Sequence, residues 1–397
     1  MQALWSAGMV SLILGYVLSQ FYRAFLAVLT PTLQTELGAG PADLALSSGL
    51  WYIAFAAMQI PVGWALDRFG PRETVSVLLA VGGAGGAAVF GLAQAPWHLH
   101  VAMALLGIGC APVMMGSYFI FARTLPPASL SAAGGAVVGF GSLGNMLGAA
   151  PLVWVIDQIS WRPTLACLAI VTLAVSTTIW VFVTNPPKLT GTQPKASLRG
   201  LLQIREWRLI LPLLGVTYAA SACIRGLWAG PYLAEVYGVS DYLIGWVTLG
   251  MGLAMVTANL SVGRIVRLLG SDKRVSLVNT VLLCCVLALL AIAPGASLTL
   301  SAVLLVMVCV SDSSYSLIMS HGRAFLPQHL VGRGITFMNM ISIAGVGVMQ
   351  FLSRPVYLSV SGNHPPAQAY GYIFLFFLIP LLIGLGFYIF SAEDRHG

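Results

Sequence analysis

The chain has 397 residues, of which 58% are hydrophobic and only 8% are charged. An ordinary soluble domain carries about 25% charged and about 45–50% apolar residues, so this composition excludes a soluble enzyme, a disordered protein and a secreted disulfide scaffold. The net charge of +7 must therefore be interpreted for a chain whose surroundings are mostly lipid.

Apolar runs long enough to cross a membrane recur along the whole chain. A membrane-spanning helix needs about 20 apolar residues, and bilayer-embedded backbone must satisfy its own hydrogen bonds, which favours helices for runs of this length. The predicted helices lie near 7–33, 44–64, 75–94, 98–121, 132–155, 162–184, 208–235, 241–262, 275–293, 297–320, 334–358 and 370–391. The sequence thus predicts an all-α integral membrane protein with twelve transmembrane helices.

Lysine and arginine residues concentrate in alternate connections between these runs. With the N-terminus placed in the cytoplasm, the inside segments hold all of the 19 Lys and Arg residues except Arg23, Arg162, Arg225 and Arg354. This positive-inside pattern predicts that both termini are cytoplasmic. Membrane topology explains the positive net charge better than nucleic-acid binding does.

The largest break in hydrophobicity, residues 185–207, contains three prolines and four basic residues. It predicts a cytoplasmic linker between two six-helix bundles, residues 1–184 and residues 208–397. The end of the linker, 197–207, fits a short amphipathic helix on the membrane surface as well as it fits a flexible connection.

The two halves resemble each other at a nearly constant offset. Residues 63–70 (Gly-Trp-Ala-Leu-Asp-Arg-Phe-Gly) correspond to residues 263–270 (Gly-Arg-Ile-Val-Arg-Leu-Leu-Gly), and the Arg-to-Pro segment 123–126 corresponds to 323–327. Parallel repeats of this kind occur in transporters that bind substrate between their halves.

The segment from Gly63 through Asp67, Arg68 and Gly70 to Arg72 resembles the signature loop of the major facilitator superfamily. Together with six helices, a linker and six more helices, the resemblance covers the whole chain. It implies two parallel bundles around a central cavity. It also implies that Asp67, Arg68 and Arg72 make gating contacts on the cytoplasmic side. Arg267 stands where a second aspartate would be, so the second latch is expected to be degenerate.

Two arginines lie deep inside predicted membrane helices, where charge is costly and usually functional, whereas Arg354 is expected near the outer interface. Arg23 in the first helix and Arg225 in the seventh are 202 residues apart. The family resemblance implies that these helices line the cavity, so the two guanidiniums are expected to face each other. An anion between them would relieve their repulsion, because guanidiniums bind carboxylate or phosphate bidentately. The alternative is that each pairs with a carboxylate, Asp312 or Glu235.

Two branches of the superfamily share parts of this pattern. Paired arginines on the first and seventh helices resemble the organophosphate/phosphate antiporters. Tyr22-Arg23 followed by Pro31 resembles the first helix of the anion/cation symporters. Both resemblances imply an organic anion as cargo.

Asp312 is the clear acidic residue inside a predicted span, and it suits either a proton-coupling group or a hydrogen-bonded structural role. Other polar and aromatic side chains within the runs can contact substrate, although each also suits packing or interface anchoring. The substrate-contact candidates are Tyr22, Tyr52, Tyr118, Asn145, Trp228 and Tyr315.

Several functional classes have no support. The six cysteines lie in apolar runs without a CxxC motif, and the six histidines lie in loops or at helix ends, so neither a metal site nor a buried histidine relay is expected. Residues 139–144 match GxGxxG by letters only, and we interpret them as small residues in a close helix contact. No catalytic residue or cofactor is predicted.

The sequence therefore predicts a secondary transporter that moves a small organic anion, a carboxylate or phosphate ester, by alternating access. Proton symport and anion exchange both remain open, and proton-driven efflux of amphipathic compounds is the main alternative. A membrane-embedded enzyme and a membrane sensor have less support. The expected setting is the bacterial inner membrane, with a monomer contacting lipid, the anion and, in symport, protons, and no nucleic acid.

Overall fold

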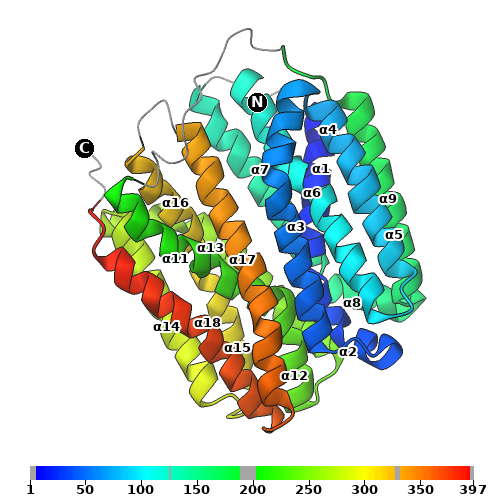
Figure 1. Ribbon diagram of the computed structural model, residues 1–397, viewed down its shortest axis with the longest axis vertical. Coiled ribbons are helices and arrows are strands. Elements are labelled where there is room, and N and C mark those ends of the chain that lie inside the picture. The colour runs from blue at the N-terminus through cyan, green and yellow to red at the C-terminus, as the bar shows by residue number, and fades with distance from the viewer. Residues whose placement is uncertain (1–5, 125–126, 188–202, 327–330, 394–397) are drawn as a thin grey trace. The chain divides into compact units, whose positions relative to one another are not determined.

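The computed structural model describes residues 6–124, 127–187, 203–326 and 331–393 (Figure 1). All regular secondary structure in these ranges is helical. Ten helical segments are long and apolar enough to cross a membrane, or up to twelve when each of two bent helix pairs forms one span. The predicted all-α membrane architecture is confirmed.

The chain divides into two compact units, Met1–Gly191 with Asp241–Leu249, and Thr192–Ser240 with Gly250–Gly397. The predicted bundle boundaries at 184 and 208 stay a prediction. The helices of the first unit are α1 (Ala7–Ala24), α2 (Leu26–Leu37), α3 (Pro41–Arg68), α4 (Pro71–Leu78), η2 (Leu79–Ala84), α5 (Gly85–Gly91), α6 (Pro96–Thr124), α7 (Pro127–Leu147), α8 (Ala150–Ile159) and α9 (Trp161–Phe182).

The second unit repeats this order of elements. The first nine residues of its α13 group with the first unit instead. Its helices are α11 (Arg205–Cys223), η3 (Ile224–Trp228), α12 (Ala229–Tyr237), α13 (Asp241–Leu269), α14 (Asp272–Ile292), α15 (Leu298–Val310), η4 (Ser311–Ser313), α16 (Ser314–Ala324), α17 (Val331–Ser361) and α18 (Pro366–Ile389).

The repeat is built into the backbone turns. Within the described ranges, the glycines with positive φ are Gly38 (67°), Gly70 (98°), Gly238 (63°) and Gly270 (76°). They form two pairs that are 200 residues apart. Glycine adopts this left-handed conformation without the penalty of a Cβ atom, which is why it ends helices so often. The predicted internal repeat is therefore confirmed at the level of helix boundaries.

Glycines also allow helices to pack closely inside each unit. A Cβ atom on Gly144 of α7 would overlap the backbone carbonyl of Val17 in α1, and one on Gly345 of α17 would overlap the carbonyl of Gly215 in α11. A Cβ atom on Gly141 would meet the ring of Tyr16. The predicted close helix contact by small residues within 139–144 is confirmed for Gly141 and Gly144.

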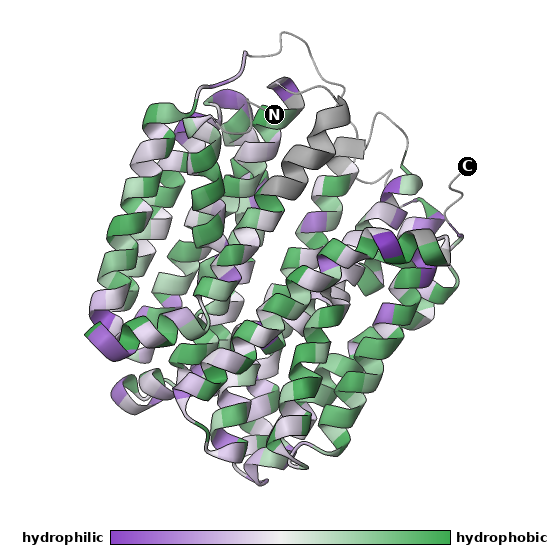
Figure 2. Cartoon of the chain, turned by 180° about the vertical axis from the view of Figure 1, so that it is seen from behind, coloured by the Kyte–Doolittle hydropathy of each residue, from purple (hydrophilic) through white to green (hydrophobic). Residues whose placement is uncertain are grey.

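The helices differ in how much of their surface the protein covers. In the most apolar stretch of α9 only 28% of residues are buried, whereas 72% are buried in the span Arg205–Tyr237. Figure 2 shows apolar residues along the lengths of the helices and hydrophilic ones mainly toward their ends. Apolar side chains that remain exposed along a spanning helix suit lipid, so α9 is peripheral and the span that carries Arg225 is central to its unit.

Candidate functional site

Arg23 lies in the last turn of α1, directly before a break in the helix at Phe25. The axes of α1 and α2 differ by 52° at this break. Only 8% of the Arg23 residue surface is exposed. The C-terminal turn of a helix favours a cation because its carbonyl groups carry partial negative charge. The break therefore places a cation at a favourable helix end within the buried part of the first unit.

Two aromatic rings of α3 hold the Arg23 guanidinium. Its Cζ atom lies 5.0 Å from the ring centroid of Trp51 and 5.0 Å from that of Phe55. The two rings are stacked on each other with centroids 5.1 Å apart. Aromatic faces attract cations, most strongly after desolvation. The pair thus compensates part of the cost of burying the charge and restricts where the guanidinium lies.

The sequence pattern indicated Tyr52 on the same helix as a substrate contact, and it did not indicate that Trp51 and Phe55 contact Arg23. The signal was present, because Trp51 and Phe55 are four residues apart and so share one face of a helix. Tyr52 is also buried, and its ring packs edge-on against Trp51 at 4.8 Å.

Arg225 lies inside η3, a five-residue π-helical segment between α11 and α12. Only 4% of its residue surface is exposed. Single π-helical turns are rare and occur frequently at functional sites. Each of the two predicted anion-binding arginines therefore lies at an irregularity of its helix, in the corresponding span of its own unit. The contact of both with one anion stays a prediction.

The other candidates of the first unit differ in their surroundings. Tyr22 is completely buried, and its hydroxyl lies 2.9 Å from Thr172 Oγ1 of α9. Asn145 of α7 is also buried, whereas 41% of Tyr118 on α6 is exposed. The contact with Thr172 joins two helices of one bundle, so a packing role describes Tyr22 well.

In the second unit, Trp228 and Tyr315 take part in side-chain hydrogen bonds. The Trp228 indole Nε1–H donates to Ser353 Oγ at 3.2 Å, and its ring lies 5.3 Å from that of Tyr357. The Tyr315 hydroxyl donates to Asn339 Oδ1 at 2.7 Å. Both side chains connect helices within the unit.

The two carboxylates that could pair with the arginines have different standing. The backbone of Asp312 lies in η4, a three-residue 3₁₀ segment that interrupts the span between α15 and α16, while its side chain lies outside the described part. Glu235 Oε2 accepts a hydrogen bond of 2.8 Å from the Tyr357 hydroxyl, so this carboxylate is engaged at the end of α12.

The three predicted gating residues make separate contacts around the α3–α4 turn. Asp67 forms an ion pair of 3.5 Å with Arg123 Nη2, and 72% of its side chain is exposed. The Arg68 guanidinium lies over the rings of Trp64 and Phe69. Arg72 Nε donates to the Trp180 carbonyl of α9 at 2.6 Å. An exposed ion pair contributes only about 0–1 kcal/mol, so the Asp67 contact can break readily.

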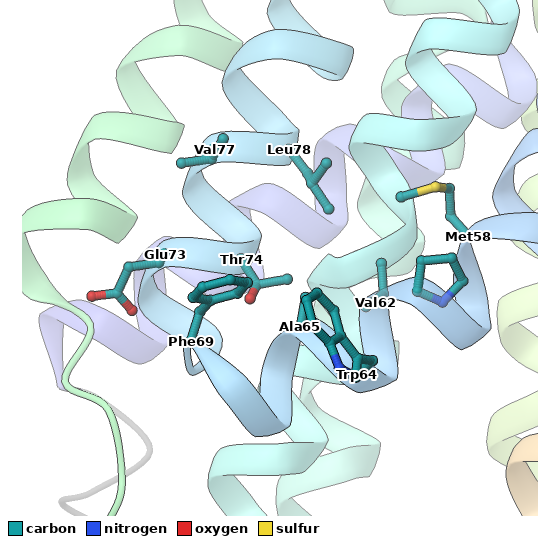
Figure 3. Close-up of a pocket in the computed structure, with 10 residues that line it drawn as sticks. Met58, Val62, Trp64, Ala65, Phe69, Glu73, Thr74, Val77 and Leu78 are labelled. Atoms are coloured by element: carbon teal, nitrogen blue, oxygen red, sulfur yellow. The ribbon is translucent and has the colours of Figure 1, made fainter.

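A crevice of about 420 Å³ opens between α3 and α4 beside this turn. Figure 3 shows Trp64 and Phe69 projecting between the two helices, while the Glu73 carboxylate points away from them. The lining of the crevice is apolar apart from Thr74 and Glu73 and contains no basic side chain. The crevice therefore does not suit an anionic cargo.

The described residues contain no group of three or more His, Cys, Asp or Glu side chains that could hold a metal ion. His321 lies at the end of α16 as predicted, but it is completely buried, which the sequence pattern did not indicate. Its Nε2–H donates to the Ala392 carbonyl at 3.0 Å, and Nδ1 lies 2.9 Å from the Tyr388 hydroxyl. Because a carbonyl only accepts, Nε2 of this ring carries a proton.

Comparison with known proteins identifies the family. The family described as Major Facilitator Superfamily matches residues 12–350. This match extends over most of the chain and includes Arg23, Arg225 and the signature loop 63–72, whose end forms the turn between α3 and α4 (the signature turn). The chain therefore belongs to the Major Facilitator Superfamily, and it is an integral membrane protein.

Curated relatives of similar sequence are transporters by name, and not enzymes. A D-galactonate transporter of Escherichia coli O6:H1 is 27% identical over 60% of this chain and 62% of its own length. A probable sulfoacetate transporter of Cupriavidus necator, SauU, is 28% identical over 40% of this chain and 37% of its own length. The chain thus spans less than two thirds of the length of these relatives.

Solved structures of the same fold cover nearly the whole chain. A bacterial homologue of the human lysosomal transporter Spinster superimposes with a TM-score of 0.78 over 97% of this chain and 96% of that one, at 16% identity. A D-xylose-proton symporter gives a TM-score of 0.77 over 97% and 98%, at 14% identity. These likenesses confirm the predicted twelve-helix fold.

Proposed function

We propose that this protein is a secondary transporter that moves a small organic anion across the membrane by alternating access. Family membership supports transport. Two relatives are named as a D-galactonate transporter and a probable sulfoacetate transporter, and these names favour an organic anion. The observation that carries the proposal is the buried Arg23 guanidinium, held against Trp51 and Phe55, with Arg225 buried at the corresponding position of the second repeat.

Arg23 and Arg225 are the groups proposed to bind the anion. A guanidinium presents a planar set of N–H donors that matches two oxygen atoms of a carboxylate, sulfonate or phosphate. In surroundings with little water, such a charge-assisted contact is stronger than on a surface. Two cations on the two bundles would favour closure of the bundles around an anion and disfavour closure around an empty site.

The coupling mode has two forms, proton symport and anion exchange. Exchange needs no separate proton site, because one anion replaces another between the arginines. Symport would use Asp312 as the proton-accepting group. Asp312→Asn should then abolish uptake driven by a pH gradient and spare the exchange of preloaded anion. Equal loss of both activities would contradict a coupling role for Asp312.

Efflux of amphipathic compounds is the second candidate function. The apolar crevice between α3 and α4 favours it, because such a surface accepts hydrophobic molecules. In that case the two arginines would have a structural role, and anions would not stabilise the protein.

A thermal-stability screen of the purified protein tests the proposal. The probes are D-galactonate, sulfoacetate, inorganic phosphate and the lipophilic cation tetraphenylphosphonium. A ligand at about 100 times its dissociation constant stabilises a protein by about 2.7 kcal/mol, so we expect a clear rise in melting temperature with at least one anion. Stabilisation by the cation alone would overturn the anion proposal and favour efflux.

Variants then locate the site. Arg23→Gln and Arg225→Gln should each abolish the anion-dependent rise while the protein without ligand still melts cooperatively. Arg354→Gln is the matched control, because Arg354 is another membrane-helix arginine, in α17, outside the proposed site. An unchanged response to anion in both site variants would exclude the arginine pair.

The remaining parts of the proposal concern the setting of the protein. We place it in a bacterial inner membrane as a monomer, with both termini in the cytoplasm. The basic residues in the α3–α4 turn and after α13 and α16 support this orientation. In this arrangement, the predicted gating residues Asp67, Arg68 and Arg72 lie at the cytoplasmic end of the first bundle.

A further inference from the structure

The side chain of Asn185 lies on the signature turn, although more than 100 residues separate them in sequence. Its Oδ1 accepts the Arg72 backbone N–H at 2.9 Å. Its Nδ2 donates to the Phe69 carbonyl at 3.2 Å and to Glu73 Oε2 at 2.6 Å. One carboxamide therefore bonds to groups on both sides of Gly70.

Position 70 requires a glycine for two reasons, its backbone conformation and its contact with Asn185. Its φ is 98°, which L-residues with a Cβ atom rarely adopt. A Cβ atom here would also overlap the Asn185 carboxamide. The glycine of the signature turn thus provides the space in which Asn185 sits.

Arg72 also connects these two regions: its side chain reaches from the start of α4 to the end of α9. Its Nε donates to the Trp180 carbonyl at 2.6 Å, and its Cζ lies 5.1 Å from the Trp180 ring centroid. Trp180 belongs to the last turn of α9, where carbonyl groups lack intrahelical partners and favour a cation. The start of α4 and the end of α9 are therefore joined by a cap on each side.

The second unit has an equivalent junction with different chemistry. Lys273, at the start of α14, donates from Nζ to the Ile389 carbonyl at 2.9 Å and to the Ser391 carbonyl at 2.5 Å, at the end of α18. Arg274 Nε bonds to Glu393 Oε1 at 2.6 Å. Among the described residues, none has an atom within 4 Å of a Cβ position at Gly270, so none of them occupies the place that Asn185 has at Gly70. In both units a basic residue at the start of one helix (Arg72 of α4, Lys273 of α14) donates to carbonyl groups at the end of another (α9 and α18, respectively).

We propose that Asn185 and Lys273 are positioning residues. Asn185 fastens the start of α4 to the end of α9, and Lys273 fastens the start of α14 to the end of α18. In the first bundle this junction fixes the signature turn, and Asn185 does so from the beginning of the predicted linker 185–207. The consequence for turnover rests on the proposed transport function: the signature turn and the end of α9 would move as one piece while the bundles change orientation.

Hydrogen–deuterium exchange of the full-length protein in lipid nanodiscs tests this directly, without any knowledge of the substrate. In Asn185→Ala, the amides of 69–76 should exchange about tenfold faster, because three hydrogen bonds are lost. The amides of 389–393 should keep their wild-type rates. Lys273→Met should give the converse, with faster exchange in 389–393 and no change in 69–76.

Each variant is thus the control for the other. Faster exchange in both segments of both variants would mean general destabilisation. Unchanged exchange of 69–76 in Asn185→Ala would show that the carboxamide does not stabilise the turn between α3 and α4. Either result overturns the proposal.

A paired exchange of donor and acceptor adds a readout that simple loss of packing would not move. N185D places a carboxylate against Glu73 and should raise exchange further than N185A. The double variant N185D/E73Q restores one donor–acceptor contact and should return the rate at least halfway to wild type. Absence of this rescue contradicts the direct contact.

Uptake separates this inference from the proposed function. With D-galactonate as probe, Asn185→Ala should lower the maximal rate about tenfold while KM stays within about twofold, as for a residue that acts on turnover and not on binding. A raised KM with an unchanged maximal rate would contradict the positioning role. If the wild-type protein transports no anion, the proposed function fails and the exchange experiment still decides the junction.

Discussion

Arg23 illustrates how a membrane protein accommodates a buried cation. A charge inside a spanning helix is unfavourable unless nearby groups compensate for lost water. Arg23 gains from its position at the end of α1 and from the faces of Trp51 and Phe55. A guanidinium carries its N–H donors along its planar edge, the geometry that matches the oxygen atoms of an anion.

The contribution of the aromatic pair can be measured by replacing Trp51 with Phe. Trp is the strongest cation–π partner, whereas Phe keeps an aromatic ring in the same place. We expect the apparent affinity for the stabilising anion to fall about two- to fivefold, corresponding to about 0.5–1 kcal/mol, as measured by thermal-shift titration.

Trp154→Phe is the matched control for this substitution, because Trp154 lies in α8 of the same unit and is 63% exposed. Its affinity for the anion should equal that of wild type. If Trp51→Phe and Trp154→Phe have the same affinity, the aromatic contact does not position Arg23 for binding.

At the scale of helices, close packing depends on a few glycines. Gly144→Ala places a methyl group against the Val17 carbonyl of α1. Overpacking of a core lowers the free energy of unfolding by about 1–3 kcal/mol. We expect the melting temperature of the purified protein to fall measurably.

Gly139→Ala on the same helix gives the opposite expectation. No heavy atom lies within 4 Å of a Cβ atom there, and alanine is favoured over glycine in a helix by about 1 kcal/mol. Its melting temperature should equal or exceed that of wild type. A fall of equal size in both variants would show that the α1–α7 contact is looser than described.

The helices were predictable from sequence, but their irregularities were not. A run of about 20 apolar residues identifies a span because lipid imposes one uniform requirement on the backbone. The break at Phe25, η3 around Arg225 and η4 around Asp312 depend on how a helix packs against its neighbours, so local composition does not reveal them. The two arginines stood out because a charge in an apolar run is conspicuous.

The contacts of the signature turn were equally hidden. The motif predicted a gating loop, and that role stays a prediction. Arg72 bonds to Trp180, 108 residues away, and Asn185 looked like the first residue of a linker. Pairing of side chains so distant in sequence follows from the tertiary fold, and the local pattern carries no record of it.

At the scale of the whole molecule, we propose two separate roles for charge. Basic residues at one end of the helices would determine orientation in the membrane, while the buried Arg23 and Arg225 would bind the cargo. The repeat duplicates both features, because its turns and its two arginines recur about 200 residues apart. Orientation and cargo binding can therefore be tested independently.

The orientation prediction can be checked with cysteines placed at opposite ends of the helices. Gly362, in the turn between α17 and α18, has no atom within 4 Å of a Cβ position, and Gln203, before α11, is exposed. In a background where the exposed Cys167 and Cys285 are replaced by alanine, a membrane-impermeant maleimide should label Gly362→Cys in intact cells. Gln203→Cys should react only after the membrane is permeabilised, because cytoplasmic segments are the ones enriched in Lys and Arg. Labelling of Gln203→Cys alone in intact cells would reverse the orientation and place the signature turn outside.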